Sequence, residues 1–441
     1  MTLSAASVHE TLGKWLLADG MSVVFDGEKS HGHYLHDAKS GKDYLDFFGF
    51  FAARALSFNH PRLREPDFVE RMSVAATHKQ SNCDLYSSDY ANFVETFATK
   101  ALGGHFKRVF FIEGGAPAIE NALKTAFDWK VRKNLAAGRG EKGKQILHFR
   151  QAFHGRTGYA LSITDSYDPR KTMYFPLWPW PRVSNPKMRF PFDEAAKAET
   201  IAAETQALKE IDEAFDKNPH DIAAIIIEPI QSEGGDNYFR SEFLRTLRKI
   251  CDDRECMLIF DEIQTGMGVT GAWWDWQNHD VKPDLMTFGK KTQVCGFAAT
   301  ARVDEVDSVF KVASRISSTF EGNIVDMVRC QRIVDVIDSD GLVDNARTMG
   351  KYQHKLLAEL AGNFSEISNV RSRGLLAAFD LPSTQERDKV VRGAFDEMLL
   401  ILPCGTKSVR MRPALDVGAD AIARCIAQLE AGVRRAYGRE A

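Results

Sequence analysis

Short, largely apolar runs alternate with helical patterns through the middle of the chain. Such runs occupy residues 109–112, 146–149, 223–227, 257–260 and 285–288. Because they are apolar at consecutive positions rather than at every second one, they predict strands that are buried on both faces, as in a parallel sheet. After the first run, apolar residues recur at helical spacing from Ile119 to Phe127. Strands that alternate with helices predict an α/β domain.

The two ends of the chain have a different pattern. Helical spacing covers residues 327–337 and a mixed α/β region follows it, while the N-terminal segment contains several short strand candidates. We therefore expect the N-terminal segment, residues 1–65, to pack with a small C-terminal domain at residues 326–441. A large domain would occupy residues 66–325 between them.

The stretch 176–191 breaks this alternation. It holds five prolines together with Trp178 and Trp180, so it cannot form the interior of a helix. We expect an ordered excursion on the surface, in which the two tryptophans pack against the protein itself or against a partner subunit.

Composition narrows the possible functions. The formal net charge is −3 and no stretch concentrates basic residues, which argues against nucleic-acid binding. No apolar run approaches the roughly 20 residues that span a bilayer, and the N-terminus lacks the pattern of an export signal. The seven cysteines form no Cys-x-x-Cys pair, and the cluster His31, His33 and His36 lacks the spacing of a metal site. These observations predict a cytoplasmic protein with no membrane segment and no bound metal.

Candidate chemical groups follow the expected strands directly. In open α/β sheets, ligands bind at the carboxyl ends of the strands. Gly114, Gly115 and Ala116 follow the first strand and open a helix, where free N–H groups and the helix dipole attract a phosphate. A glycine turn before a helix is more often only a turn, so by itself this is a weak indication of a ligand.

Asp261 and Lys290 lie at the ends of two neighbouring expected strands, in an apolar setting. A single aspartate is more often a helix cap or a structural carboxylate, and most lysines lie on the surface. A lysine at a buried strand end, however, is a candidate for a lowered pKa and for amine nucleophilicity. Together the two residues supply what pyridoxal phosphate requires: an amine that forms a Schiff base, and a carboxylate that keeps the pyridine nitrogen protonated.

A second glycine motif has a different interpretation. Residues 266–271, Gly-Met-Gly-Val-Thr-Gly, match the dinucleotide-binding fingerprint and follow a strand. That fingerprint requires a helix behind the third glycine, but the next residues include Trp273, Trp274 and Trp276. We therefore expect a loop near the active site rather than a nicotinamide or flavin site.

Taken together, the motifs resemble those of the class III aminotransferases, a fold type I family of pyridoxal-phosphate enzymes. They stand in the family's order and spacing over nearly the whole chain: Glu-Gly-Gly-Ala-x-Ala-x-Glu-Asn-Ala from Glu113, Phe-His-Gly-Arg from Phe153, Glu-Pro-Ile-Gln-x-Glu-Gly-Gly from Glu228, Phe-Asp-Glu-x-Gln-Thr-Gly from Phe260 and Phe-Gly-Lys-Lys from Phe288. The resemblance implies a mostly parallel seven-stranded sheet between helices, with a smaller α/β domain formed by both ends of the chain. Within the class, residues 81–84, 127–130 and 289–296 look most like those of the L-lysine 6-aminotransferases.

The resemblance implies pyridoxal 5'-phosphate as the cofactor, and it implies the residues that hold it. Lys290 matches the lysine that forms the Schiff base, and Asp261 matches the partner of the pyridine nitrogen. The other matching cofactor-binding positions are Gly115 and Ala116 at the phosphate, Phe153 on the ring face, Gln264 near the phenolic oxygen, and Glu228. Thr319 matches a threonine that reaches the phosphate of the partner subunit's cofactor, which implies a homodimer with shared sites.

The resemblance also implies the substrates. Arg156 matches the residue that binds the α-carboxylate of lysine, and Arg410 matches the one that binds the α-carboxylate of the oxoacid substrate, 2-oxoglutarate. Glu233 matches a switch that pairs with Arg410 when lysine is bound and moves away for the oxoacid. The implied ping-pong reaction transfers the ε-amino group of L-lysine to 2-oxoglutarate. Its products are L-glutamate and 2-aminoadipate 6-semialdehyde, which cyclises to piperideine-6-carboxylate.

Several departures from the pattern keep the amino donor open. The chain has Ser317, Phe320, Glu321 and Ala414 where the lysine enzymes usually have other residues. Ornithine and 4-aminobutyrate differ from lysine by one or two methylenes or by the α-amine, and a methylene is worth only about 1–3 kcal/mol in a pocket. An isomerase or racemase on the same scaffold, and a binding protein without catalysis, are the alternatives from other classes.

Overall fold

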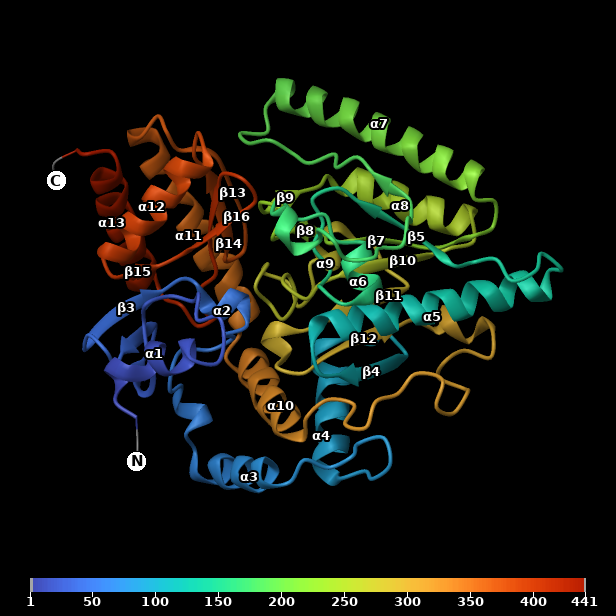
Figure 1. The fold of residues 1–441 in the computed structure, drawn as a ribbon, viewed down its shortest axis with the longest axis horizontal. Coiled ribbons are helices and arrows are strands. Elements are labelled where there is room, and N and C mark those ends of the chain that lie inside the picture. The colour runs from blue at the N-terminus through green and yellow to red at the C-terminus, as the bar shows by residue number, and fades with distance from the viewer. Residues whose placement is uncertain (1–2, 440–441) are drawn as a thin grey trace.

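The computed structural model describes residues 3–439 and consists of two parts (Figure 1). The larger part is built around a seven-stranded sheet in the order β4-β12-β11-β10-β7-β5-β6. Its strands are β4 (Arg108–Ile112), β5 (Gln145–Phe149), β6 (Arg182–Val183), β7 (Ile222–Ile227), β10 (Met257–Asp261), β11 (Leu285–Phe288) and β12 (Cys295–Ala299). β12 is antiparallel to both of its neighbours, and the other pairings are parallel. The mostly parallel seven-stranded sheet is therefore confirmed.

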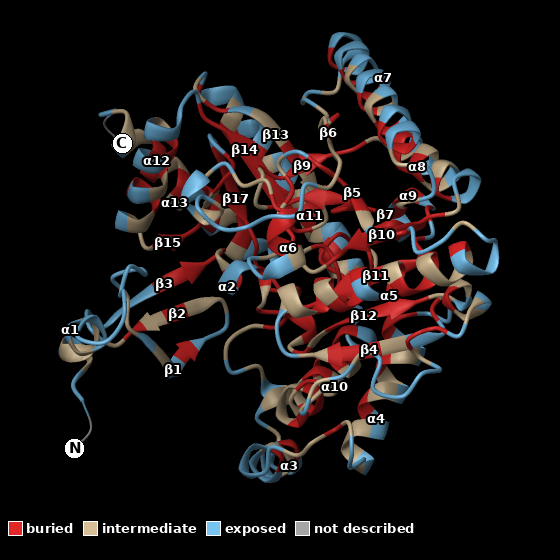
Figure 2. Ribbon diagram, turned by 45° about the vertical axis from the view of Figure 1, so that its right-hand side comes forward, coloured by how far each residue is buried: buried red, intermediate tan, exposed pale blue. Residues whose placement is uncertain are grey.

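The strands are buried on both faces, as their continuous apolar runs predict. In β10, Met257 and Ile259 pack in one cluster with helix α5 (Gly115–Ala136), whereas Leu258 and Phe260 pack in another with helix α8 (Ser241–Asp253). All four side chains are fully buried. Figure 2 shows the buried strands between helices whose outer surfaces are exposed. The sheet is thus a dry layer whose strand ends are held in fixed positions.

The smaller part contains chain from both ends. β15 (Leu399–Leu400) pairs in parallel with β3 (Lys42–Asp46), so N-terminal and C-terminal segments share a sheet in the order β1-β2-β3-β15. A second sheet has the order β13-β14-β17-β16. The remaining strands of these sheets are β1 (Phe25–His31), β2 (Tyr34–Asp37), β13 (Ser368–Arg373), β14 (Leu376–Asp380), β16 (Leu402–Cys404) and β17 (Ser408–Met411). The boundaries at 65/66 and 325/326 stay a prediction, and residues 1–2 and 440–441 of the outer segments lie outside the described residues.

Helices form where the sequence is periodic. α5 and α10 (Ile324–Ser339) cover the helical stretches that the sequence pattern predicts. α7 (Glu194–Lys217) is a further long helix. The other α-helices are α1 (Val8–Gly13), α2 (Gly49–Ala52), α3 (Pro66–Thr77), α4 (Ser88–Thr96), α6 (Gly158–Ser162), α9 (Trp276–His279), α11 (Leu342–Asn363), α12 (Thr384–Asp396) and α13 (Ala419–Ala436). Two short strands, β8 (Ile230–Gln231) and β9 (Asn237–Tyr238), pair with each other. Within residues 3–439, no helix has the length and apolar character needed to cross a membrane.

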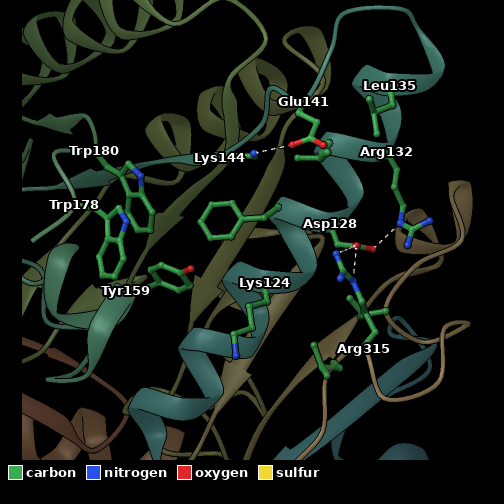
Figure 3. Close-up of a pocket in the computed structure, with 14 residues that line it drawn as sticks. Lys124, Asp128, Arg132, Leu135, Glu141, Lys144, Tyr159, Trp178, Trp180 and Arg315 are labelled. Atoms are coloured by element: carbon green, nitrogen blue, oxygen red, sulfur yellow. Dashed lines mark hydrogen bonds and ion pairs between the residues drawn. The ribbon is translucent and has the colours of Figure 1, made fainter.

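The proline-rich stretch is an ordered surface segment that packs against the protein itself. The rings of Trp178 and Trp180 stack with their centroids 6.0 Å apart, and Tyr159 and Phe127 pack against them. Figure 3 shows the tryptophans and Tyr159 beside α5, where they border a groove of about 830 Å³. None of the site residues expected from the sequence lines this groove.

The glycine motif at residues 266–271 forms a loop, as expected. The next helix, α9, begins only at Trp276. A Cβ on Gly266 would lie 2.3 Å from the ring of Trp274, so the glycine is needed for the packing of that tryptophan. The motif therefore serves loop packing, and no helix follows it closely enough to bind a dinucleotide.

β12 is a strand that the sequence pattern does not predict. Gly296, Ala298 and Ala299 give it little of the β-branched character that marks strands in general. The small residues are nevertheless required, because a Cβ on Gly296 would lie 2.1 Å from the backbone oxygen of Phe110 and 2.8 Å from the ring of Phe288. The strand is thus defined by the space between its neighbours rather than by its own propensity.

We expect Gly296→Ala to lower the free energy of unfolding by about 3 kcal/mol, because the added methyl group must displace backbone in the middle of the sheet. Denaturant unfolding measures the change. Gly13→Ala is the control, since a Cβ there meets nothing within 4 Å, and it should change stability by less than about 0.5 kcal/mol. Equal stabilities of the two variants would contradict this account of β12.

Candidate active site

One cavity collects the side chains that the sequence motifs select. Its volume is about 410 Å³, and its lining residues are Phe51, Gly115, Ala116, Phe153, His154, Gly155, Arg156, Lys171, Glu228, Glu233, Asp261, Ile263, Gln264, Lys290 and Arg410. All of the expected site residues are among them except Thr319. The structure therefore brings together groups that lie far apart in the sequence.

The parallel strands explain this convergence. β10 ends at Asp261, and it lies between β7, which is followed by Glu228, and β11, which is followed by Lys290. β5 leads into the segment with Phe153, and β4 leads into α5 through Gly115. Because the carboxyl ends of parallel strands meet at one edge of a sheet, the residues that follow them face a common space.

Asp261 is held by three hydrogen bonds. Its Oδ2 accepts from Nδ1 of His154 at 2.8 Å, and its Oδ1 accepts from the Thr287 hydroxyl and the Ile263 backbone N–H, each at 3.1 Å. Both Asp261 and His154 are buried, so the carboxylate is fixed in orientation. A carboxylate has about four lone-pair sites, and Asp261 therefore retains acceptor capacity toward the cavity.

His154 is a site residue that the sequence motifs did not single out. It stands beside Phe153 in the Phe-His-Gly-Arg motif, but it lies 107 positions before Asp261. Its other ring nitrogen, Nε2, is buried and has no partner in the described part of the chain. The motif was the available signal, and only the fold shows which carboxylate the imidazole meets.

Lys290 and Lys291 have different surroundings. Burial lowers the pKa of the Lys290 amine, and the charge of Arg410 lowers it further. The Lys290 side chain lines the cavity, and its backbone has a φ of 55°. Lys291 instead donates from Nζ to the Ala52 carbonyl oxygen at 2.7 Å, outside the set of lining residues. The lysine that faces the cavity is therefore the first of the pair.

The N-terminus of α5 faces the same cavity. The helix has 22 residues and starts at Gly115, after Gly114 with a φ of 96°. A Cβ on Gly115 would lie 3.2 Å from the Ile263 side chain, so a glycine keeps this approach open. The N–H groups of a first helical turn have no partner within the helix, and they carry its positive dipole end. This end of the cavity suits a phosphate.

Glu228 is a buried carboxyl group beside Asp261. It accepts hydrogen bonds from the backbone N–H groups of Phe153 at 2.9 Å and Ser232 at 3.1 Å. Burial raises the pKa of Glu228 well above its usual value, and the negative charge of Asp261 raises it further. Glu228 thereby anchors the backbone that carries the Phe153 ring.

Arg410 and Glu233 are not paired with each other in the structure. Glu233 Oε1 accepts from the Ser166 hydroxyl at 2.8 Å and pairs with the amine of Lys171. The Nε and Nη1 atoms of Arg410 are buried and have no hydrogen-bond partner among residues 3–439. Of the two positions expected for the Glu233 switch, the structure shows the one away from Arg410. Arg156 lies exposed at the edge of the cavity.

Thr319 lies apart from the other expected residues. It is exposed, and its backbone oxygen accepts a hydrogen bond from the thiol of Cys83 at 3.5 Å. It does not line the cavity of its own chain. A contact with a cofactor in another subunit is compatible with this position and stays a prediction.

The cavity fits a phosphorylated pyridine aldehyde. A helix N-terminus, a fixed carboxylate and an amine of lowered pKa lie around one space, and Gln264 Oε1 is a buried acceptor that lacks a partner in the described structure. A cavity of this size and polarity is typical of a cofactor site. The sheet and this set of groups together define fold type I of the pyridoxal-phosphate enzymes.

Comparison with known proteins places the chain within that class. The family model described as aminotransferase class-III matches residues 18–433. The chain belongs to the class III aminotransferases.

Two curated relatives indicate where the chain stands in the family. The L-lysine-epsilon aminotransferase of Mycobacterium tuberculosis is 48% identical over 97% of this chain and 95% of its own length. The mitochondrial 4-aminobutyrate aminotransferase of Homo sapiens is 30% identical over 90% of this chain and 82% of its own length. The similarity is therefore much greater to the relative named for lysine.

A solved structure of a lysine aminotransferase is also similar to this chain. The lysine aminotransferase from M. tuberculosis, in the internal aldimine form, has a TM-score of 0.96 and 46% sequence identity to this chain. The match covers 98% of this chain and 100% of the other. The expected α/β fold with a smaller second part is confirmed over almost its whole length.

Proposed function

We propose that this aminotransferase uses pyridoxal 5'-phosphate to transfer the ε-amino group of L-lysine to 2-oxoglutarate. The products are 2-aminoadipate 6-semialdehyde, which cyclises to piperideine-6-carboxylate, and L-glutamate. The observation that carries the proposal is the cavity in which Lys290, Asp261 and the N-terminus of α5 converge. The 48% identity to a lysine ε-aminotransferase supports lysine as the donor.

The cofactor roles follow from the positions of the residues. Lys290 would bind the cofactor covalently, and the N–H groups of Gly115 and Ala116 would bind its phosphate. Asp261, oriented by His154, would hold the proton on the pyridine nitrogen. The remaining contacts would come from Phe153 on the ring face and Gln264 at the phenolic oxygen. Glu228 would act indirectly, because it accepts a hydrogen bond from the Phe153 backbone N–H. When bound, pyridoxal phosphate supplies an electron sink for the substrate carbon that loses its proton.

Lys290 also moves the proton. Burial and the nearby Arg410 lower the pKa of its amine, so a larger share of the free amine is neutral near pH 7. A neutral amine accepts the proton from the substrate carbon at Nζ and delivers it to the other reacting carbon, which is general acid–base catalysis by one group. The neutral form is favoured because the amine is buried next to a cation.

The charged residues around the cavity orient the substrates. Arg156 would bind the α-carboxylate of lysine at the edge of the cavity, which places the ε-amine near Lys290. Arg410 would bind the α-carboxylate of the oxoacid, and a guanidinium fork suits a carboxylate. Glu233 would neutralise Arg410 while lysine occupies the site, because an unpaired buried guanidinium is costly.

A homodimer would complete the site. Thr319 is exposed and contacts Cys83. Close to Cys83 in the chain, the large side chains of Leu85 and Tyr86 are 69% and 80% exposed to solvent. Contiguous exposed apolar side chains are typical of a protein interface. We infer that a second copy covers this surface and receives Thr319 at its cofactor phosphate. A cytoplasmic location is part of the same proposal.

A panel of amino donors tests the function. We expect kcat/KM for L-lysine to exceed the values for ornithine and 4-aminobutyrate by at least about tenfold, as differences of one methylene or one charged group allow. Glutamate formation and bleaching of the cofactor absorbance are the measurements. A higher kcat/KM with ornithine or 4-aminobutyrate would make that amine the donor. Turnover without 2-oxoglutarate would instead indicate an isomerase.

A further inference from the structure

Lys171 is a cation in the candidate site that no sequence motif marks. It ends the short 3-10 helix Pro169–Lys171, which is capped where the Asp168 side chain accepts from the Arg170 backbone N–H at 3.1 Å. Its amine lies 5.0 Å from the ring centroid of Tyr167 and 5.7 Å from that of Phe153. Cations over aromatic faces are stabilised electrostatically. Lys171 is therefore held at the edge of the cavity by its own segment and by two rings.

Glu233 lines the same cavity as two cationic residues, Lys171 and Arg410. Its Oε1 is satisfied by Lys171 and Ser166, while its Oε2 is buried without a partner in the described structure. Arg410, the alternative partner, presents buried N–H groups that also lack partners there. The carboxylate is thus only half satisfied where it lies, and Arg410 offers it a second partner in the same cavity.

We propose that Lys171 sets the balance between these two positions of Glu233, and so tunes the affinity of Arg410 for an oxoacid carboxylate against an amino donor. The proposal rests on the proposed function. With Glu233 on Lys171, Arg410 is free for an incoming α-carboxylate. With Glu233 on Arg410, the same site accepts a donor that carries no anion there. Lys171 acts through Glu233 and is a positioning residue.

The balance has opposite consequences for the two substrates. A ligand that binds only one of two conformations has its apparent affinity reduced by the fraction of protein in the other. Weakening the Lys171–Glu233 pair therefore raises the population with Glu233 on Arg410. The oxoacid should then bind more weakly and the amino donor more tightly, which general damage to the site would not produce.

Lys171→Met tests the proposal, because it removes the charge and keeps the length of the side chain. Glutarate, a dicarboxylate that cannot react, is the probe, and calorimetric titration of the holoenzyme gives its Kd. We expect the Kd for glutarate and the Michaelis constant for the oxoacid substrate to rise on the order of tenfold, and the Michaelis constant for lysine to fall. Lys171→Arg keeps the cation and should restore most of the affinity for glutarate.

The same substitution in a Glu233→Ala background separates the proposal from its alternatives. Without the carboxylate, Lys171→Met should change the Kd for glutarate by less than about twofold, since the coupling between the members of a pair vanishes when one member is removed. An equal loss in both backgrounds would mean that Lys171 binds the ligand itself, and an unchanged Kd in the single variant would mean that it does not position Glu233. Either result overturns the proposal. Glutarate binding needs no amino donor. Failure of lysine as a substrate would therefore refute the proposed donor, but the comparison of Lys171→Met in the two backgrounds would still test the role of Lys171.

Discussion

Replacing Lys290 with alanine is expected to lower kcat by more than about a thousandfold. The substitution removes the amine that would both bind the cofactor covalently and transfer the proton. Glutamate formation from lysine and 2-oxoglutarate measures the loss. Borohydride reduction of the wild-type protein, followed by peptide mass analysis, should locate the cofactor on the peptide that contains Lys290. The variant should show no such adduct, even when it still binds the cofactor without a covalent bond.

Lys291→Met is the matched control for this experiment. Lys291 is buried, and its amine donates to the Ala52 carbonyl oxygen, so the amine does not face the cavity. Burial lowers the pKa of Lys291 well below its usual value. Methionine keeps the length of this buried side chain and removes its amine. The control should keep the adduct on Lys290. An adduct on Lys291, or substantial turnover by Lys290→Ala, would contradict the assignment.

Replacing Asp261 with asparagine is expected to lower kcat by about 10²–10⁴-fold, the range that loss of one positioned acid–base partner produces. Asparagine keeps the shape, and its single amide oxygen can accept from either Thr287 or His154. It has no negative charge to hold a proton on the pyridine nitrogen. Single-turnover rates with lysine measure the effect on chemistry, and unfolding curves check that the fold is retained.

A chemical rescue distinguishes this role of Asp261 from a merely structural one. A cofactor analogue that is methylated on the pyridine nitrogen carries a permanent positive charge and does not need the carboxylate. We expect the analogue to recover a large part of the rate in Asp261→Asn and to give no gain in the wild-type protein. Equal rates of the variant with both cofactors would refute the proposed contact with the ring nitrogen.

Much of the large part of the fold could be predicted from local patterns. The apolar runs at β4, β5, β7, β10 and β11 are confirmed within a residue or so of their bounds. They could be identified because a strand buried on both faces is apolar at nearly every position. β12 could not be identified in the same way. Its glycine, Gly296, is required by the limited space next to the backbone of Phe110 and the ring of Phe288 on the neighbouring strands.

The candidate site shows the same division. Gly115, Asp261 and Lys290 could be selected because each follows a strand, and the ends of parallel strands must meet. Their chemical roles stay a prediction, and so do the homodimer and the role of Thr319. Lys171 could not be selected, since nothing in the residues around it differs from an exposed polar loop. Only the packing of that loop over the cavity brings its amine to Glu233.

The sequence by itself determined the α/β pattern, the positions of the strand ends and the set of groups that suits one cofactor, because these depend on local periodicity and on the order of residues. The tertiary structure decided which of those groups meet. His154 reaches Asp261 across 107 residues, and Lys171 reaches Glu233 across 62. Such contacts depend on how loops pack after the sheet has formed, and no local propensity encodes them. They also decide the orientation of the Asp261 carboxylate and the partners of Glu233.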